Sequence, residues 1–238
     1  MEFDHEKIKI LVIDDSDIIR ASLKKFLLEY DIEVVTSTDG LEGLQQAIEH
    51  KPRLIFLDLM MPNLDGIRLL RVMKVMEELK RIPVIVISGH TDKVNVIAAT
   101  EAGADKIVSK PLSKDVLIRS INEVLGSNFL GTTKKFVSLS NAEKEQMTKE
   151  LRKYFIHSLA NKRQTLNQAL QHKNKELLKM VVHELKGTSG TVGFHQITDI
   201  CREIEEVVAK SGSGWSKIEL KCNALIESFN QAELSVSK

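Results

Sequence analysis

Polar side chains follow four of the apolar runs in the first half of the sequence. Asp14 and Asp15 come directly after the first run, and Asp58 follows the third. Ser88 and Lys110 follow the fourth and fifth runs. If these runs are parallel strands of one open sheet, their carboxyl ends meet at one edge, where such sheets bind ligands. We therefore expect the five side chains to form one site.

The residue types at this edge suit the binding and transfer of a phosphoryl group. Three carboxylates placed together repel one another unless a divalent cation neutralises them. An all-oxygen acidic site suits Mg2+, which commonly bridges carboxylates to a phosphate. Lys110 would add a fixed positive charge and Ser88 a hydroxyl donor for the phosphoryl oxygens. For Asp14 and Asp15 taken alone, a role as turn or helix-cap residues is an equal alternative.

A second candidate for chemistry is His183, which lies in a stretch with helical periodicity. The apolar residues of this stretch fall on one face, and the spacing places His183 on the other. Its neighbours three, four and seven positions away are Lys179, Lys186, Gly187 and Gly190. Lysines attract phosphate, and two glycines inside a helix cost about 1 kcal/mol each, which close approach of a partner would explain. A histidine can serve as a covalent nucleophile.

Short apolar runs alternate with helical stretches from about residue 7 to residue 126. The expected strands are residues 8–13, 32–35, 54–57, 82–87 and 107–108. Most of these runs are continuous rather than alternating, as in parallel strands that helices cover on both faces. The pattern therefore predicts five βα units that form one α/β domain with a parallel sheet.

The sequence after residue 126 has a different character. Gly, Ser, Thr and two Lys interrupt the periodicity in residues 127–139, which we interpret as a linker. Residues 140–238 lack proline and show successive amphipathic helical patterns without strand candidates. Cys201 and Cys222 match neither a disulfide framework nor a metal site, so we expect reduced core thiols. We predict an α/β domain at residues 1–126 and an all-α domain of the four-helix-bundle type at 140–238.

The composition is that of a globular protein, and the charge does not indicate nucleic-acid binding. Charged residues make up 28% and apolar residues 42% of the 238 residues, which is typical of globular domains. Residues 1–126 hold 17 Lys and Arg against 21 Asp and Glu, a net charge of −4, and the remainder holds 17 against 12, or +5. This positive charge is too modest and scattered to indicate nucleic-acid binding.

The hydropathy pattern bears on localisation. No apolar run approaches the roughly 20 residues that a membrane helix needs, and the first residues are too polar and acidic for a signal peptide. We therefore expect a soluble, cytoplasmic protein with no membrane partner.

The first domain resembles the receiver domain of bacterial response regulators over about residues 7–126. The matching segments are ILVIDDS at 10–16, FLDLMMPNLDG at 56–66, VISG at 86–89 and SKP at 109–111. The resemblance implies a flavodoxin-like, doubly wound (βα)5 fold with Asp58 as the phosphoacceptor. It implies that Mg2+ is held by Asp14, Asp15, Asp58 and the backbone carbonyl of Met60. It also implies that Ser88 and Lys110 bind the phosphoryl oxygens.

One departure from this family concerns Ile107, three positions before Lys110. The family often has an aromatic switch residue at that position. The usual aromatic rotamer switch therefore cannot operate in this chain.

The segment HELKGTSGTVGF at 183–194 resembles the signature of histidine-containing phosphotransfer (HPt) domains, and the similarity in pattern extends over about residues 138–238. The resemblance implies a helical bundle in which His183 is an exposed, phosphorylated histidine, with Lys186 beside it. The two signatures together imply a two-component phosphorelay protein that accepts a phosphoryl group on Asp58 and exchanges phosphoryl groups through His183. The expected partners are a sensor histidine kinase, other receiver domains, or both. The sequence leaves a homodimer through the receiver domain open.

Two other functions are open on the sequence. In a protein-binding switch, phosphorylation of Asp58 would control access to the helical domain. In a dehalogenase-type, Mg-dependent phosphatase, Asp15-Ser16-Asp17 would supply the DxD core. Asp17 leads directly into a helical stretch, which weighs against the phosphatase. We expect a phosphotransfer signalling protein rather than an enzyme, in which the receiver domain can assist its own phosphorylation and dephosphorylation.

Overall fold

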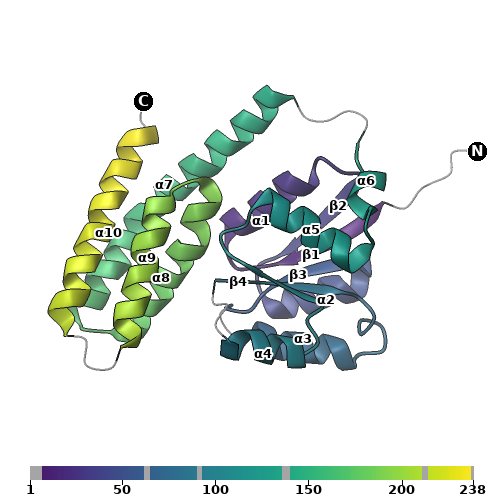
Figure 1. Ribbon diagram of the computed structural model, residues 1–238, viewed down its shortest axis with the longest axis horizontal. Coiled ribbons are helices and arrows are strands. Elements are labelled where there is room, and N and C mark those ends of the chain that lie inside the picture. The colour runs from purple at the N-terminus through teal and green to yellow at the C-terminus, as the bar shows by residue number, and fades with distance from the viewer. Residues whose placement is uncertain (1–6, 62–64, 90–92, 136–139, 211–213, 237–238) are drawn as a thin grey trace, which may run out of the picture. The chain divides into compact units, whose positions relative to one another are not determined.

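The computed structural model of the chain describes residues 7–61, 65–89, 93–135, 140–210 and 214–236 (Figure 1). The chain divides into two compact units, Met1–Asn141 and Ala142–Lys238. The strands of the first unit are β1 (Ile8–Ile13), β2 (Ile32–Ser37), β3 (Leu54–Asp58), β4 (Val84–Ser88) and β5 (Lys106–Ser109). They are parallel and lie in the order β2-β1-β3-β4-β5. The predicted five-stranded parallel sheet is confirmed, although β4 begins two residues later than expected, after Pro83.

Helices cover both faces of this sheet. They are α1 (Asp17–Leu27), α2 (Gly40–His50), α3 (Gly66–Val75), α4 (Lys93–Glu101) and α5 (Lys114–Leu125). Because successive side chains along a strand point to opposite faces, Phe56 packs with residues of α1 and α5, whereas Leu57 packs with residues of α2, α3 and α4. Both residues are fully buried. This two-sided burial explains why the strands appear in the sequence as continuous apolar runs.

The loops that follow β1, β2 and β3 each end in a side chain that caps the next helix. Asp39 accepts hydrogen bonds from the amides of Leu41 and Glu42, and Glu42 in turn accepts one from the Thr38 amide. Ser16 caps α1 and Asp65 caps α3 in a similar way. These bonds satisfy amides that a helix start leaves without partners. They also anchor Ser16, Asp39 and Asp65 at the starts of the helices that follow β1, β2 and β3.

The segment expected to be a linker, residues 127–139, differs from that expectation over its described part. Residues Phe129–Thr132 form a short helix, α6, and Leu130 is buried in the core that contains Phe56. Beyond α6, Lys135 donates its amide to the Glu29 carbonyl and the Asp31 amide donates to the Thr133 carbonyl. The chain is therefore bound to the first unit as far as Lys135.

The described part of the second unit contains four α-helices, in agreement with the predicted bundle. They are α7 (Asn141–Gln171), α8 (Lys175–Ser189), α9 (His195–Ala209) and α10 (Trp215–Val236), with a 3-10 turn at Gly190–Val192 after α8. Each helix contributes fully buried apolar side chains, among them Phe155, Leu178, Cys201 and Phe229. Cys222 is also buried, and both cysteines are free thiols, as expected. None of the described helices is both long enough and apolar enough to cross a membrane.

Candidate functional site

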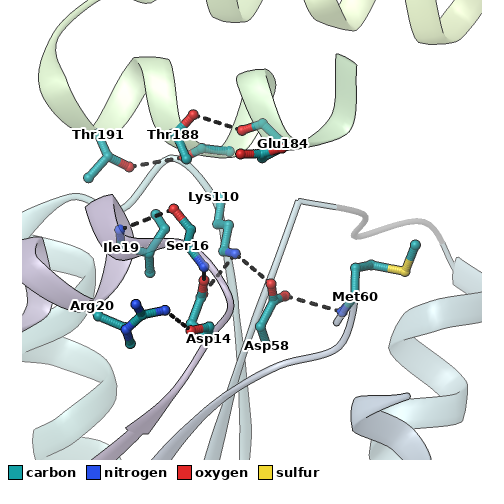
Figure 2. A network of polar contacts seen from close by, with 11 residues as sticks. Asp14, Ser16, Ile19, Arg20, Asp58, Met60, Lys110, Glu184, Thr188 and Thr191 are labelled. Carbon is teal, nitrogen blue, oxygen red and sulfur yellow. Dashed lines mark hydrogen bonds and ion pairs between the residues drawn. The ribbon is translucent and has the colours of Figure 1, made fainter. Parts of the chain in front are cut away.

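Three carboxylates meet at the carboxyl edge of the sheet, as the sequence predicts (Figure 2 shows two of them). Asp14 and Asp15 follow β1, and Asp58 is the last residue of the neighbouring strand β3. One oxygen from each carboxylate lies within 4.8 Å of the other two. Asp14 and Asp58 are buried and Asp15 is exposed. The group therefore consists of two buried acids and one acid at the solvent side, and we refer to it below as the acid pocket.

Lys110 lies between the two buried acids. Its Nζ is 2.9 Å from Oδ2 of Asp14 and 2.9 Å from Oδ2 of Asp58. Its side chain is only 6% exposed. The backbone beside it is tied to the next strand, because the Lys110 amide donates to the Ser88 carbonyl. Burial lowers the pKa of Lys110, but the attraction of Asp14 and Asp58 outweighs burial and raises that pKa above its usual value. Lys110 is therefore a fixed cation.

One cation is not enough to balance the pocket. Burial raises the pKa of Asp14 to about 6; Lys110 opposes this rise, and Asp58 adds to it by repulsion. A raised carboxylate pKa means that the surroundings favour the neutral acid, so the site is short of positive charge. An all-oxygen donor set with one solvent-exposed acid fits a hard divalent ion that keeps water ligands. The residues of this pocket therefore fit Mg2+.

The other residues expected at this site lie around Asp58. Met60 is half-exposed, and its amide donates a 3.3 Å hydrogen bond to Oδ1 of Asp58 (Figure 2). Ser88 is the last residue of β4 and is buried. The residue before Ser88 in β4 pairs with Asp58 in the sheet. Ile107 is partly buried against the core of the α3 side. Both carboxylate oxygens of Asp58 are thus held, one by the Met60 amide and one by Lys110.

The start of α3 packs directly on the backbone of the phosphoacceptor candidate. A Cβ placed on Gly66 would lie 2.2 Å from the Asp58 carbonyl oxygen and 2.7 Å from the Leu59 Cα. The Gly66 amide donates to the Leu59 carbonyl. Because backbone atoms cannot yield as flexible side chains do, any side chain at Gly66 must displace α3 or the residues around Asp58.

We predict that Gly66→Ala lowers the free energy of unfolding by about 1–3 kcal/mol, the range for overpacking a tight interior. Urea denaturation followed by circular dichroism would measure this loss. The matched control is Gly214→Ala, because a Cβ on Gly214 would meet nothing within 4 Å. Equal stability of the two variants would contradict the close contact at Asp58.

His183 lies in α8 and faces an acid of the neighbouring helix α9. Its Nδ1 is 3.5 Å from Oε1 of Glu205, and Glu205 also forms an ion pair with Lys186. The side chains of His183, Lys186 and Glu205 are 14%, 9% and 18% exposed. His183 is thus less exposed than the resemblance implies. Lys179, also expected beside His183, instead pairs with Glu176 at the surface.

The end of α8 is fixed by polar side chains and by the turn that follows. Thr188 and Ser189 donate to carbonyls four residues earlier, and Ser189 also bonds Thr198 of α9 at 2.8 Å (Figure 2 shows Thr188). Gly193 has a φ of +91°, a backbone conformation that favours glycine. Gly187 and Gly190 are both buried, but only Gly187 lies inside α8, because the helix ends at Ser189 and Gly190 begins the 3-10 turn. These contacts hold α8 in a fixed position against α9.

Glu205 was not among the residues predicted from the sequence. It lies 22 positions after His183, so no helical spacing connects the two residues. The sequence signal that could have identified Glu205 was its position next to the row of buried residues on α9, which includes Cys201 and Ile204. Only the packing of α9 on α8 brings its carboxylate to His183.

Comparisons with known proteins agree with the geometry of both units. The family model for the response regulator receiver domain matches residues 10–122, and the Hpt domain model matches residues 150–232. Protein PilG of Pseudomonas aeruginosa is 33% identical over 121 residues, which cover 51% of this chain and 90% of that protein. The transcriptional regulatory protein CseB of Streptomyces avermitilis is 36% identical over 120 residues, which cover 50% of each chain.

A solved structure of the chemotaxis protein CheY4 of Vibrio cholerae is 26% identical, with a TM-score of 0.48, and the match covers 50% of this chain and 99% of that one. The chain spans only about half the length of several curated relatives, CseB among them. The receiver match at residues 10–122 lies in the unit that contains the three carboxylates, and the Hpt match at residues 150–232 lies in the unit that contains His183. The chain therefore belongs to the response regulator receiver family through its first unit and carries an Hpt domain as its second.

Proposed function

We propose that this chain is a two-component phosphorelay protein that accepts a phosphoryl group on Asp58 and exchanges phosphoryl groups through His183. The observation that supports this most strongly is the occurrence of both sites in one chain. The Asp58 carboxylate beside Lys110 would accept phosphoryl groups, and His183, which faces the Glu205 carboxylate, would donate or accept them. The proposed partners are a sensor histidine kinase and other receiver domains. The proposal includes neither nucleic-acid binding nor an enzymatic activity on an outside substrate.

At the receiver site, we propose that a carboxylate oxygen of Asp58 attacks the phosphorus of a phosphorylated histidine. The P–N bond breaks as the P–O bond forms, and the leaving imidazole takes up a proton. Lys110, 2.9 Å from Asp58, would stabilise the negative charge on the phosphoryl oxygens, and Ser88 would donate a hydrogen bond. Asp14, Asp15, Asp58 and the Met60 carbonyl would hold Mg2+, which supplies further charge neutralisation.

At the Hpt site, the contact with Glu205 suggests which nitrogen reacts. A carboxylate facing Nδ1 favours a proton on that nitrogen, and it leaves the lone pair on Nε2. Nε2 would then attack the phosphorus of a phosphorylated aspartate, and the P–O bond to the departing carboxylate would break as the P–N bond forms. Glu205 would stabilise the positive charge that develops on the ring. Lys186, which pairs with Glu205, would exchange this partner for a phosphoryl oxygen.

Intact-mass analysis of the full chain tests the proposal. The chain would be incubated with Mg2+ and either acetyl phosphate or phosphoramidate, and then treated with acid or base. We expect a base-labile phosphoryl group that is lost in Asp58→Ala and an acid-labile one that is lost in His183→Ala. Asp31→Ala and His157→Ala, which remove exposed residues of the same types, serve as controls and should retain both groups.

The outcomes separate the proposed relay from the alternatives. Phosphate on Asp58 alone, with His183 unreactive towards small donors and towards phosphorylated receiver domains, would favour the protein-binding switch. Covalent phosphate on Asp15 would favour the phosphatase. In the structure, however, Asp17 pairs with Arg20 in the first turn of α1, and the carboxylate cluster of the described residues consists of Asp14, Asp15 and Asp58.

A further inference from the structure

Arg20 of α1 extends back to the loop that carries the acid pair. Its side chain is only 11% exposed. Nη1 donates a 2.5 Å hydrogen bond to the backbone carbonyl of Asp14, and Nη2 pairs with the carboxylate of Asp17 (Figure 2 shows Arg20 beside Asp14). One guanidinium thus connects the last residue before the exposed acid with the first turn of the helix that follows it.

The bonded carbonyl belongs to the peptide that joins Asp14 to Asp15. A peptide unit is planar, so the direction of its carbonyl sets the orientation of the whole unit and of the Asp15 Cα attached to it. The Asp14 side chain has other restraints, because its Oδ1 accepts from the Ser16 amide and its Oδ2 lies beside Lys110. The bond from Arg20 therefore mainly sets the direction in which the Asp15 side chain projects from the backbone.

We infer that Arg20 is a positioning residue, which orients the Asp14–Asp15 peptide so that the Asp15 carboxylate points to a bound divalent cation. The inference rests on the proposed metal pocket. A guanidinium is suited to this task because its rigid planar fork fixes the directions of both bonds, whereas the donors of a lysine ammonium rotate on a flexible stem. Groups that orient metal ligands in this way commonly change metal affinity by 10- to 100-fold.

A role of Arg20 through its charge and a role through its geometry predict opposite changes in Mg2+ affinity. If Arg20 affected the pocket only through its charge, Arg20→Met would remove a cation near the metal and Mg2+ would bind more tightly. If Arg20 positions Asp15, Mg2+ should bind about tenfold or more weakly to Arg20→Met. Arg20→Lys keeps the charge but loses the fork, so we expect weaker binding there as well. Asp17→Asn weakens the second anchor of the guanidinium, and we expect a smaller loss of affinity.

Isothermal titration of the full chain with Mg2+ alone measures these affinities. The matched control is Lys74→Met, because Lys74 also joins a carbonyl and a carboxylate, those of Ile82 and Asp105, but at the amino ends of β4 and β5. We expect Lys74→Met to lower the melting temperature and to leave Mg2+ affinity unchanged.

The titration tests the positioning role of Arg20 and the existence of the metal pocket separately. Wild-type affinity in both Arg20 variants, or tighter binding in Arg20→Met, would overturn the positioning role. Failure of the wild-type chain to bind Mg2+ would instead overturn the metal pocket itself. If Arg20→Met does not fold, Arg20→Lys still separates the two explanations, because it keeps the charge and loses the fork.

Discussion

Replacement of Lys110 by methionine should lower the free energy of unfolding by about 3–5 kcal/mol in magnesium-free buffer, the usual cost of removing one partner from a buried ion pair. Lys110 is the cation that lies 2.9 Å from both Asp14 and Asp58, and those acids are 1% and 3% exposed. Without it, two buried carboxylates face each other with their nearest counter-charge gone. Chemical denaturation in the presence of a chelator would measure the loss.

The size of this loss should depend on pH. The pKa of Asp14 is about 6 even with Lys110 present, well above that of a free aspartate, because burial raises it. Removal of Lys110 should raise this pKa further. A folded state that binds an extra proton loses stability as pH rises between the unfolded and the folded pKa. The loss caused by Lys110→Met should therefore be smaller at pH 5 than at pH 8.

Added Mg2+ should recover part of the stability of Lys110→Met, because a dication in the pocket replaces the missing charge. Lys106→Met is the control: its amine pairs with Glu123 at the surface, where an ion pair contributes about 0–1 kcal/mol. A Lys110→Met protein as stable as Lys106→Met at pH 8 without Mg2+ would show that the buried pair does not exist as described.

Glu205→Leu should have the second large effect, on both stability and transfer. It leaves Lys186, whose side chain is 9% exposed, without its counter-ion, and we expect a loss of about 3 kcal/mol, the lower end for a buried pair. It also removes the carboxylate that faces Nδ1 of His183. Phosphorylation of His183 by phosphoramidate should therefore slow by at least about tenfold, because the ring loses its orienting group.

A double variant separates these two effects. Lys186→Met combined with Glu205→Leu replaces both charges by apolar groups, which commonly restores stability. The slow phosphorylation of His183 should remain, because the acid at Nδ1 is still missing. The control is Glu203→Leu on the same helix, which breaks an exposed pair with Lys221 and should cost less than about 1 kcal/mol. Full recovery of the rate in the double variant would contradict the orienting role of Glu205.

The acid pocket could be predicted because the apolar runs mark the strands, and the polar residues that follow them mark the ends of those strands. Asp14, Asp58 and Lys110 each follow an apolar run, and a parallel sheet brings the ends of its strands together regardless of the details of packing. The runs around Phe56 and Leu57 were continuous because both faces of β3 are covered. The meeting of these residues at one edge of the sheet thus follows from local sequence and one topological rule.

Two features could not be predicted in this way. Helix α6 contains only Phe129–Thr132, which is too short to show helical periodicity, and its sequence has the Gly and Thr of a linker. Its formation depends on the burial of Leu130 in a core built by distant residues. Glu205 reaches His183 only through the rotation of α9 against α8, which the spacing of apolar residues does not define closely enough to place one carboxylate.

The attachment of residues 133–135 determines which residues of the first unit would bear a pulling force on the chain. Tyr30 and Lys134 form an antiparallel bridge, and Lys135 bonds Glu29, so a pull on the chain beyond Lys135 is borne by residues 29–31. These residues precede β2, at the amino end of the sheet, whereas the acid pocket lies at the carboxyl end. Tension in the connecting chain would therefore first break the bonds at residues 29–31, and the geometry around Asp58 is shielded from it.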